Sequence, residues 1–537
     1  MAHDDSNRTW QRDLQLETPL ADTFRVQPVA PQVPGLTILW HPDGRRIGER
    51  VVLRRLTSGR TVEVSRLEPL FAPPAGGGSQ RPLADAYVSR KPFALVPAGD
   101  GGVVIRRGDS HTRLAVDGEP LLEEHRLGLV ELGRGVVLLL ANRIVLLLHH
   151  LDAIAPESVP AFGLVGESSA IVHVRQQIER VAEQDVAVLI RGATGTGKEL
   201  VAEAIHRASP RRTGPWVAVN MGAIPTSLAT AELFGAARGA FTGATRPHRG
   251  HFGRADGGTL LLDEIGEAPI EVQVQLLRTL ETGEVQPVGG NRPQPVDVRV
   301  IAATDSDLER LAEEGRFRLP LLHRLASYEI TIPPLVARRD DLGRLLYFFL
   351  QQELDALDAR EVLADRGRPE DAWLPAPLLA RLCLLPWPGN VRQLANVARH
   401  MAINYHDQRQ VRLDAELERL LEADASRSLP AVIVDTPTPM PQPRRYRKPS
   451  EVTEEELVAA LRANRWQIKP TAEALGISRP SLYVLMERSP SVRKATDLSR
   501  EEIESCLASC GGDLEAASEA LQVSISGLKM RIKALGL

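Results

Sequence analysis

The sequence is poor in the residues that build disulfide or metal-held scaffolds. Its 537 residues include only three cysteines, and their positions fit no metal-ligand spacing. This usage predicts a reducing compartment, the cytoplasm. The cysteines are Cys383, Cys506 and Cys510.

Long apolar runs and a strong charge imbalance are also missing. No segment reaches the ~18–20 uncharged apolar residues of a membrane span, so we expect no membrane partner. The most apolar run, residues 135–151, is interrupted by Arg143 and predicts two strands with Ala141 and Asn142 near the turn. A net charge of −4 argues against binding nucleic acid over the whole surface. The polar start of the sequence predicts no secretion signal.

A chain of this length predicts a multidomain protein with roughly three or four domains. After a disordered lead over residues 1–35, short β-rich runs separated by Gly and Asp turns predict an N-terminal all-β sandwich over residues 36–151. One of these runs is residues 127–132. Alternating strand and helix patterns predict a central α/β subdomain over residues 162–333, followed by a helical lid over residues 334–423.

The C-terminal part predicts two all-α units after a linker. The linker, residues 424–450, is rich in proline. An internal repeat with an offset of 46 residues follows, in which Leu457 corresponds to Ile503. The pattern of each copy predicts a helix-turn-helix, over residues 451–494 and 495–537.

Residues 186–199 combine a buried strand, a glycine-rich loop, a lysine and a helix start, the order of a phosphate-binding loop. The glycines let backbone N–H groups close on phosphates, and Lys198 neutralises the β/γ oxygens. Glu199 occupies the usual Ser/Thr position, so a Mg²⁺ ion must depend on other ligands. An ordinary glycine-rich turn is the alternative. The predicted phosphate-binding residues are Gly192, Ala193, Thr194, Gly195, Thr196, Gly197, Lys198 and Glu199.

Residues 258–264 form an apolar strand that ends in two carboxylates, Asp263 and Glu264. Asp263 would hold Mg²⁺ directly or through water, and Glu264 would orient an attacking water. Together with the phosphate-binding loop, they predict an ATPase that uses ATP and Mg²⁺. A buried strand with an acidic end is the alternative.

A hexapeptide of unusual composition lies between these two motifs. Its small residues flank one aromatic and one hydroxyl side chain, which an extended loop can present to a partner. The adjacent nucleotide site supplies a reason to move such a loop, whereas a hairpin without a partner is the alternative. The hexapeptide is Gly239, Ala240, Phe241, Thr242, Gly243 and Ala244.

The segment from Gly192 to Arg392 resembles the AAA+ domain of bacterial sigma-54-dependent transcriptional activators (enhancer-binding proteins). The resemblance implies that the hexapeptide contacts sigma-54. The motifs that carry it are Glu199, Glu232-Leu233-Phe234-Gly235, residues 239–244, residues 263–267 and residues 387–392.

The resemblance also implies roles for residues around the nucleotide. Asn220 is similar to the switch residue that couples Glu264 to the nucleotide state. Thr304 stands at the sensor I position, where the next residue, Asp305, departs from the usual Asn. Arg392 stands at the sensor II position, which touches the phosphates from the lid.

Two further arginines, Arg318 and Arg324, match the pair that reaches the ATP of a neighbouring subunit. Such a residue stabilises transition-state charge only in an assembled ring. The resemblance therefore implies a homo-oligomer, a hexameric ring that is a dimer when inactive. Plain surface arginines are the alternative.

The first C-terminal unit resembles the Fis-type helix-turn-helix that ends most such activators. Gly476 suits the tight turn, and Ser478 can cap the recognition helix. Residues 444–494 carry eleven basic and six acidic residues, a local excess suited to phosphate contacts. A plain helical hairpin is the alternative. The residues predicted to bind DNA are Ser478, Arg479, Ser481 and Tyr483.

The second C-terminal unit differs in charge. Residues 495–537 carry four basic and seven acidic residues, and Ile525 replaces Arg479. This unit is therefore predicted either to make a subordinate contact with DNA or to serve as a dimerisation unit.

The β-rich region resembles a forkhead-associated domain, a sandwich that binds phosphothreonine. The resemblance implies a phosphopeptide site formed by Arg66, Ser89 and Arg90, with input from a Ser/Thr kinase. A sandwich kept for subunit contact is the alternative. The departures from the family pattern are Ser65, Pro92 and Asp117.

Together these patterns predict an ATP-driven activator that binds upstream double-stranded DNA and acts on sigma-54 and RNA polymerase. Two other classes compete with this interpretation. A DNA-remodelling AAA+ motor would not need residues 239–244. A binding-only regulator with an inactive ATPase is disfavoured by Lys198, Asp263 and Glu264.

Overall fold

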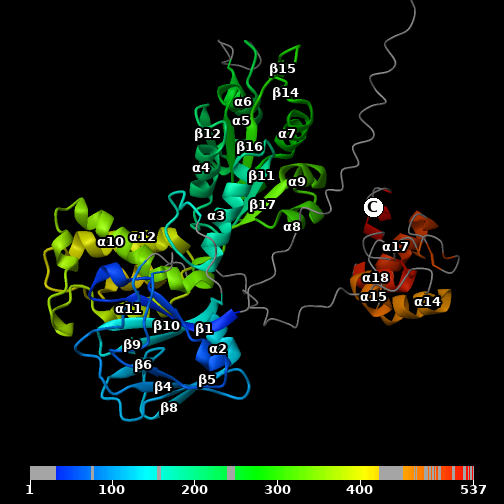
Figure 1. Ribbon diagram of the computed structural model, residues 1–537. Coiled ribbons are helices and arrows are strands. Elements are labelled where there is room, and N and C mark those ends of the chain that lie inside the picture. Colours follow the sequence, from blue (N-terminus) through cyan, green and yellow to red (C-terminus); the bar gives the residue numbers. More distant parts are fainter. Residues whose placement is uncertain are drawn as a thin grey trace, which may run out of the picture. The chain divides into compact units, whose positions relative to one another are not determined.

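The chain divides into two compact units, residues 1–431 and residues 432–537 (Figure 1). The predicted disordered lead up to residue 31, residues 239–244 and the linker over 424–450 lie outside the described residues, as do Ser478, Arg479, Ser481 and Tyr483. This computed structural model describes residues 32–73, 78–153, 159–238 and 248–422, and then 452–464, 468–476, 497–510, 514–523 and single residues or pairs between 466 and 535.

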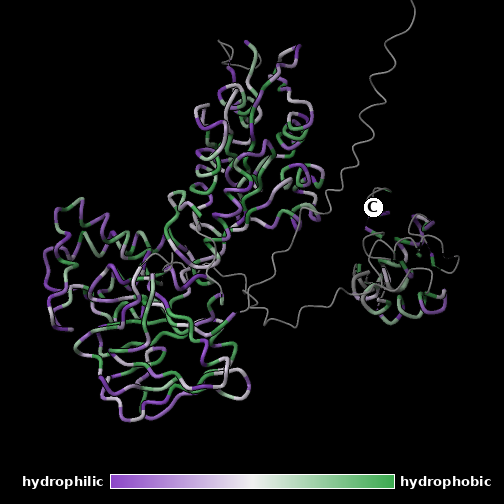
Figure 2. The backbone as a smooth tube through the Cα atoms, in the orientation of Figure 1, coloured by the Kyte–Doolittle hydropathy of each residue, from purple (hydrophilic) through white to green (hydrophobic). Residues whose placement is uncertain are grey.

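The N-terminal region forms two antiparallel sheets around one hydrophobic core. Alternate residues point inward, so that Leu36 and Ile38 of one sheet and Leu95 and Ile105 of the other belong to the same buried cluster. Figure 2 shows this hydrophobic character along the strands. The first sheet has the order β2 (Arg50–Val52), β1 (Gln32–Trp40), β10 (Ile144–Asp152), β9 (Val136–Leu140), β6 (Leu114–Val116) and β7 (Glu119–Pro120). The second has the order β3 (Val62–Val64), β4 (Phe93–Pro97), β5 (Val103–Arg106) and β8 (Glu124–Leu127).

The turn predicted near Ala141 and Asn142 is confirmed. Both residues have left-handed backbones, with φ of 51° and 53°, and they join β9 to β10 as the twist of a tight hairpin requires. The strand predicted over residues 127–132 is wrong, because the chain turns there into a short helix, α2 (Leu129–Arg134). The Glu131 carboxylate accepts a 2.7 Å hydrogen bond from the Gly128 N–H and caps that helix.

The central region is a five-stranded parallel sheet with helices on both faces. Alternate residues of each inner strand enter opposite clusters; Leu189 lies on one face, and Val188 and Ile190 on the other. The strands are β12 (Trp216–Asn220), β13 (Thr259–Asp263), β16 (Arg299–Thr304), β11 (Val188–Arg191) and β17 (Tyr328–Thr331), in that order. The helices are α3 (Ser169–Ala182), α4 (Lys198–Ala208), α5 (Thr226–Phe234), α6 (Gly250–Arg254), α7 (Ile270–Thr282), α8 (Leu308–Glu313) and α9 (Leu319–Leu325). A small ribbon pairs β14 (Glu284–Val285) with β15 (Gln294–Pro295).

The lid is helical, as predicted. A 3₁₀ segment, η5 (Leu335–Asp341), leads from the sheet into it. Its helices are α10 (Leu342–Asp355), α11 (Ala376–Leu384), α12 (Asn390–Tyr405) and α13 (Ala415–Glu422). None of the described helices has the length and apolar character needed to cross a membrane.

The β-sheets and the lid share a hydrophobic core. Residues of β1, β9 and β10, such as Leu39 and Val145, belong to the same buried cluster as the inner faces of α10, α11 and α12. The Arg143 guanidinium is buried and lies 2.7 Å from the lid carboxylate of Asp365. Figure 1 shows β1 and β10 beside these helices. The N-terminal region is therefore packed onto the lid rather than tethered to it.

The second unit contains two small helical clusters. Leu457, Leu461 and Trp466 anchor the first, and Ile503 and Leu528 belong to the second, so the repeated residues occupy separate cores. An all-α C-terminal region is confirmed. Its helices are α14 (Glu454–Ala463), α15 (Ile468–Leu475), α17 (Arg500–Ser509) and α18 (Leu514–Leu521).

The packing of α10 on β1 leads to a prediction for Gly343. A Cβ atom added there would lie 1.8 Å from the carbonyl oxygen of Leu39, so Gly343→Ala must push the lid from the sheet. We expect a loss of about 1–3 kcal/mol of stability, measured as a lower midpoint of thermal unfolding.

Gly133→Ala, in the exposed helix α2, is the matched control, because a Cβ atom there meets no atom within 4 Å. It should leave the midpoint unchanged or raise it. Equal midpoints for the two variants would contradict the close packing of α10 on β1.

Candidate nucleotide-binding site

Four of the predicted site segments meet at one edge of the parallel sheet. Asn220 ends β12, Asp263 ends β13 and Thr304 ends β16, and the phosphate-binding loop begins directly after β11. Because the strands are parallel and adjacent, their carboxyl ends bring these residues together. The edge therefore forms a crevice of the kind that binds ligands in α/β folds.

The phosphate-binding loop needs glycine for two different reasons. Gly195 and Gly197 have φ of 78° and 104°, left-handed values that favour glycine. A Cβ atom on Gly195 would also lie 2.3 Å from the carbonyl oxygen of Gly389 in the lid. The loop is thus shaped both for a ligand and for close contact with the lid.

Lys198 is buried at the start of α4 and already has an anionic neighbour. Its Nζ donates to the Gly192 carbonyl at 3.0 Å and lies 3.4 Å from the Glu264 carboxylate. Burial raises the pKa of Glu264, and nearby Asp305 raises it further, whereas Lys198 opposes both. Glu264 has a left-handed backbone with φ of 52°, which sequence patterns do not reveal. Such strain is common at functional positions.

Asp263 has the chemistry of a Mg²⁺ ligand. Its Oδ1 atom is buried without a hydrogen-bond partner in the described part of the chain, and its Oδ2 accepts from the Asn220 amide at 3.4 Å. A buried, unpaired carboxylate oxygen suits a hard cation. Asp263 therefore fits the predicted metal role, and Asn220 contacts this residue rather than Glu264.

At the sensor I position, the side chain that reaches the phosphate-binding loop is that of Asp305, whereas Thr304 reaches it through its backbone carbonyl, which accepts the Gly192 N–H at 3.2 Å. The Thr304 hydroxyl is buried and accepts the N–H of Ser306 at 3.0 Å. The Asp305 carboxylate accepts the hydroxyl of Thr194 at 2.6 Å. The departure from Asn thus places an additional carboxylate against the loop.

The lid closes the site and supplies part of its apolar wall. The Arg392 N–H donates to the Gly195 carbonyl at 3.2 Å. Phe349 of α10 and Leu200 of α4 face the same cavity, and both are absent from the sequence prediction because they fit ordinary helix patterns. The cavity measures about 330 Å³ and is lined by Thr194, Gly195, Gly197, Lys198, Glu199, Leu200, Asn220, Asp263, Glu264, Phe349, Val391, Arg392 and Ala395.

The two predicted trans arginines lie outside this cavity. Arg318 is exposed at the start of α9. The Arg324 guanidinium donates to the Leu280 carbonyl at 2.8 Å, also on the exterior. Neither residue lines the nucleotide cavity of its own chain.

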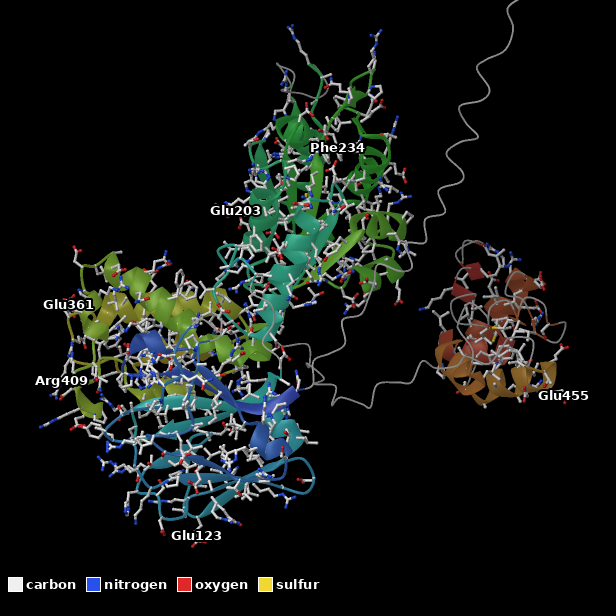
Figure 3. All side chains as sticks on the ribbon, in the orientation of Figure 1. Glu123, Glu203, Phe234, Glu361, Arg409 and Glu455 are labelled. Carbon is white, nitrogen blue, oxygen red and sulfur yellow. The ribbon has the colours of Figure 1, made fainter. Side chains whose placement is uncertain are left out.

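The base of the hexapeptide loop is tightly held. Ala236 and His248 exchange backbone hydrogen bonds of 2.9 Å on either side of it. Phe234, labelled in Figure 3, stacks on Phe252 with ring centroids 5.4 Å apart, which joins α5 to α6. The described residues on either side of the hexapeptide are therefore held by the packing of α5 on α6.

In the β-domain, the structure brings two of the three predicted phosphopeptide residues together. The Arg66 N–H donates to the Ser89 carbonyl at 3.2 Å, and Arg90 is exposed beside them. Asp117 has a left-handed backbone, and its carboxylate accepts the Val137 N–H at 2.8 Å. Its charge is thus partly satisfied within the sheet.

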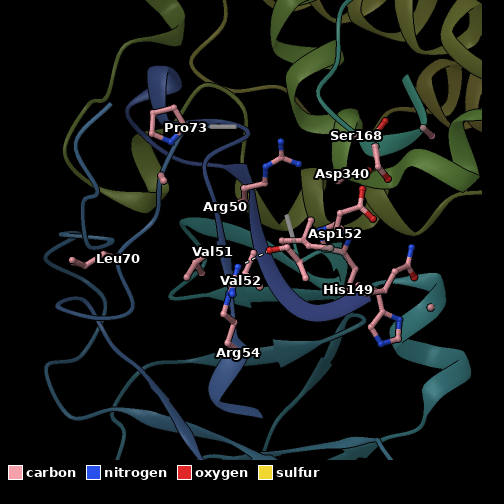
Figure 4. A pocket seen from close by; sticks show the side chains of 18 of the residues that line it. Arg50, Val51, Val52, Arg54, Leu70, Pro73, His149, Asp152, Ser168 and Asp340 are labelled. Carbon is pink, nitrogen blue, oxygen red and sulfur yellow. Dashed lines mark hydrogen bonds between the residues drawn. The ribbon is translucent and has the colours of Figure 1, made fainter. Parts of the chain in front are cut away.

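A larger cavity lies away from the nucleotide site. It measures about 700 Å³ and runs between the β2 and β10 strands and the segments at Ser168 and Asp340 (Figure 4). Burial and the neighbouring Asp341 raise the pKa of Asp340 to about 8. This cavity shares no lining residue with the cavity at the phosphate-binding loop. Cavity size alone therefore does not locate the nucleotide site.

Three segments of the chain match known families. Residues 164–331 match the Sigma-54 interaction domain, and residues 337–429 match the AAA+ ATPase lid domain. Residues 449–488 match the Fis family of bacterial regulatory proteins.

Relatives align with the same region. The DNA-binding transcriptional regulator NtrC of Klebsiella pneumoniae is 44% identical over 288 residues, which span 53% of this chain and 57% of NtrC. The chain thus spans little more than half the length of that relative. A crystal structure of NtrX from Brucella abortus in complex with ATP is 33% identical, with a TM-score of 0.41 over 61% of this chain and 69% of NtrX.

The transcriptional regulatory protein ZraR of Escherichia coli (strain K12) is matched more fully. It is 38% identical over 343 residues, which span 63% of this chain and 72% of ZraR. Together with the sigma-54 interaction, lid and Fis-type segments, this extent of similarity shows that the chain belongs to the family of bacterial sigma-54-dependent transcriptional activators.

Proposed function

We propose that this chain hydrolyses ATP in the cytoplasm and uses the energy to activate transcription by sigma-54 RNA polymerase. The observation that carries the proposal is the crevice at the sheet edge, where Lys198, Asp263 and Glu264 meet within the segment that matches the Sigma-54 interaction domain. A binding-only regulator would not need this set of residues.

In the proposed reaction, the terminal phosphate of ATP replaces Glu264 as the anionic partner of Lys198. Glu264 is then free to orient a water molecule toward the γ-phosphorus atom. Asp263 would hold Mg²⁺, which would supply positive charge to the phosphate oxygens. The apolar wall formed by Phe349, Leu200 and Val391 suits the adenine ring.

A neighbouring subunit completes the site. Because Arg318 and Arg324 lie outside the cavity of their own chain, we infer that they reach the ATP of the next subunit in a hexameric ring. Their charge would stabilise the transferring phosphoryl group only after assembly. A dimer would then be the inactive form.

The nucleotide site and the hexapeptide loop are connected by a short path. Asn220 contacts Asp263 and leads through a 3₁₀ turn directly into α5, which ends at the base of the loop. A displacement of Asn220 on hydrolysis would therefore move α5 and with it residues 239–244. We propose that Phe241 and Thr242 transmit this movement to sigma-54.

The proposed transmission of movement to sigma-54 leads to a prediction for Thr242→Ala. We expect the variant to keep wild-type ATPase activity and to lose open-complex formation by sigma-54 RNA polymerase. The substitution removes the proposed contact of the Thr242 hydroxyl with sigma-54 and leaves the residues of the ATP site unchanged. Thr245→Ala, just beyond the hexapeptide, is the control and should activate normally. Normal open-complex formation by Thr242→Ala would refute the role of the loop.

The C-terminal region is proposed to bind double-stranded DNA upstream of the promoter. Arg479→Ala should weaken binding by about 1–3 kcal/mol in a mobility-shift assay at fixed salt. Arg462→Ala, which removes an exposed charge from α14 outside the recognition helix, is the control. Unchanged affinity for Arg479→Ala would contradict the proposed role of Arg479 in DNA binding.

The role of the second unit needs a separate measurement. Deletion of residues 495–537 should reduce either the affinity for DNA or the oligomeric state, because the unit is proposed to serve one of these purposes. If both stay unchanged, neither role holds.

The β-domain is proposed to be a forkhead-associated sensor that binds a protein phosphorylated on threonine by a Ser/Thr kinase. Its two sheets around one core and the adjoining loops of Arg66 and Ser89 support this proposal. Arg66→Ala should abolish binding of a phosphothreonine peptide, because it removes the charged hydrogen bond to the phosphate. Equal binding of phosphorylated and unphosphorylated peptides by the wild type would refute it.

A further inference from the structure

Asn390, the first residue of α12, links the lid to the phosphate-binding loop through its side chain. It is only 2% exposed. Its amide nitrogen donates to the Thr194 carbonyl at 3.0 Å and to the Pro388 carbonyl at 3.2 Å. Its amide oxygen accepts the Leu335 N–H at 2.8 Å. One buried side chain thus joins the phosphate-binding loop, the start of the lid and the turn before α12.

The backbone around Asn390 is shaped to bring it there. Its φ of 51° is left-handed, a conformation that Asn tolerates better than most residues. Trp387 before it is also left-handed and buried, and its indole N–H donates to the Leu382 carbonyl at 2.9 Å. The turn that presents the amide is therefore held rigidly by the lid.

The contacts beside Asn390 place the lid directly on the phosphate-binding loop. The Arg392 N–H donates to the Gly195 carbonyl, and the Gly389 carbonyl approaches Gly195 so closely that no side chain fits between them. Within α12, the Asn390 side chain uses both amide N–H groups and its oxygen in hydrogen bonds, one of them to the loop. The Arg338 guanidinium, which precedes the lid helices, makes a longer contact of 3.4 Å with the Thr196 carbonyl. The Asn390 amide is therefore the group that can specify how α12 sits on the loop.

We propose that Asn390 is a positioning residue for ATP hydrolysis. Its amide fixes the start of α12 against Thr194, so that Arg392, two residues later, faces the phosphates across the cavity. The inference rests on the proposed ATPase function. Asn390 itself touches no reacting atom and acts through Arg392.

If Asn390 only stabilised the lid, replacing any other buried amide side chain of α12 would change the kinetics of ATP hydrolysis in the same way. Gln393 offers that comparison, because it is 7% exposed and bonds only within the lid, to the Gly389 N–H at 3.1 Å and the Leu420 carbonyl at 3.0 Å. Gln393→Ala should therefore lower the unfolding midpoint without changing the KM for ATP.

Two substitutions of Asn390 separate the side chain from the backbone. Asn390→Asp keeps the shape of the side chain and the oxygen that accepts the Leu335 N–H. It places a carboxylate oxygen next to the Thr194 carbonyl, where no hydrogen bond can form. Asn390→Gly keeps the left-handed backbone and removes the amide. Both should raise the KM for ATP of the full chain by about ten-fold, with a smaller change in kcat.

The decisive measurement is a double-mutant cycle with Arg392→Ala, using steady-state ATP hydrolysis by the full chain. If Asn390 acts through Arg392, Asn390→Gly should cost nothing further in kcat/KM in the Arg392→Ala background. Effects that add fully, or a KM unchanged in both Asn390 variants, would overturn the proposal. A wild-type chain that hydrolyses no ATP would instead refute the proposed function.

Discussion

The contact between the lid and the phosphate-binding loop is the interaction on which the nucleotide site depends. The loop carries the phosphate-binding backbone, and the lid carries Arg392 and Phe349. These two halves meet where the Gly389 carbonyl approaches Gly195, a position at which only glycine permits the approach. If the lid moved away, the cavity would lose Phe349 from its apolar wall together with Arg392, the cation that faces Lys198. Closure of the lid is therefore part of the site rather than an addition to it.

The lid is also the base of the N-terminal β-domain. Strands β1, β9 and β10 bury side chains in the same core as α10, α11 and α12, and the buried pair of Arg143 and Asp365 crosses this boundary. A core packed at crystal-like density transmits displacement instead of absorbing it. We therefore expect a change in the β-domain to reach the ATP site through α12, as a change in the lid angle. This coupling would be reciprocal, so that nucleotide binding would also alter the β-domain.

Local motifs predicted much of the fold and the centre of the site. The strands that lead into the phosphate-binding loop and end in Asp263 follow from apolar runs, whereas the roles of Asn220 and Thr304 come from the family resemblance; the meeting of all these residues follows from the topology. The left-handed backbone of Glu264 and the bond from Thr194 to Asp305 could not be predicted, because they depend on distant packing. The wrong strand over residues 127–132 has a local cause: its apolar residues also suit a short helix, which the Glu131 carboxylate caps. The shared core of lid and β-domain joins residues about 200 positions apart, which no local pattern encodes.

If ATP hydrolysis drives activation, the nucleotide state must control the binding of the chain to sigma-54. The most direct test is to incubate the full chain with sigma-54 and a transition-state mimic, ADP with aluminium fluoride, and to measure complex formation by size-exclusion chromatography. A stable complex should form with the mimic and not with ADP or without nucleotide. If the chain hydrolyses ATP but forms no complex with sigma-54 in any nucleotide state, the central claim is contradicted.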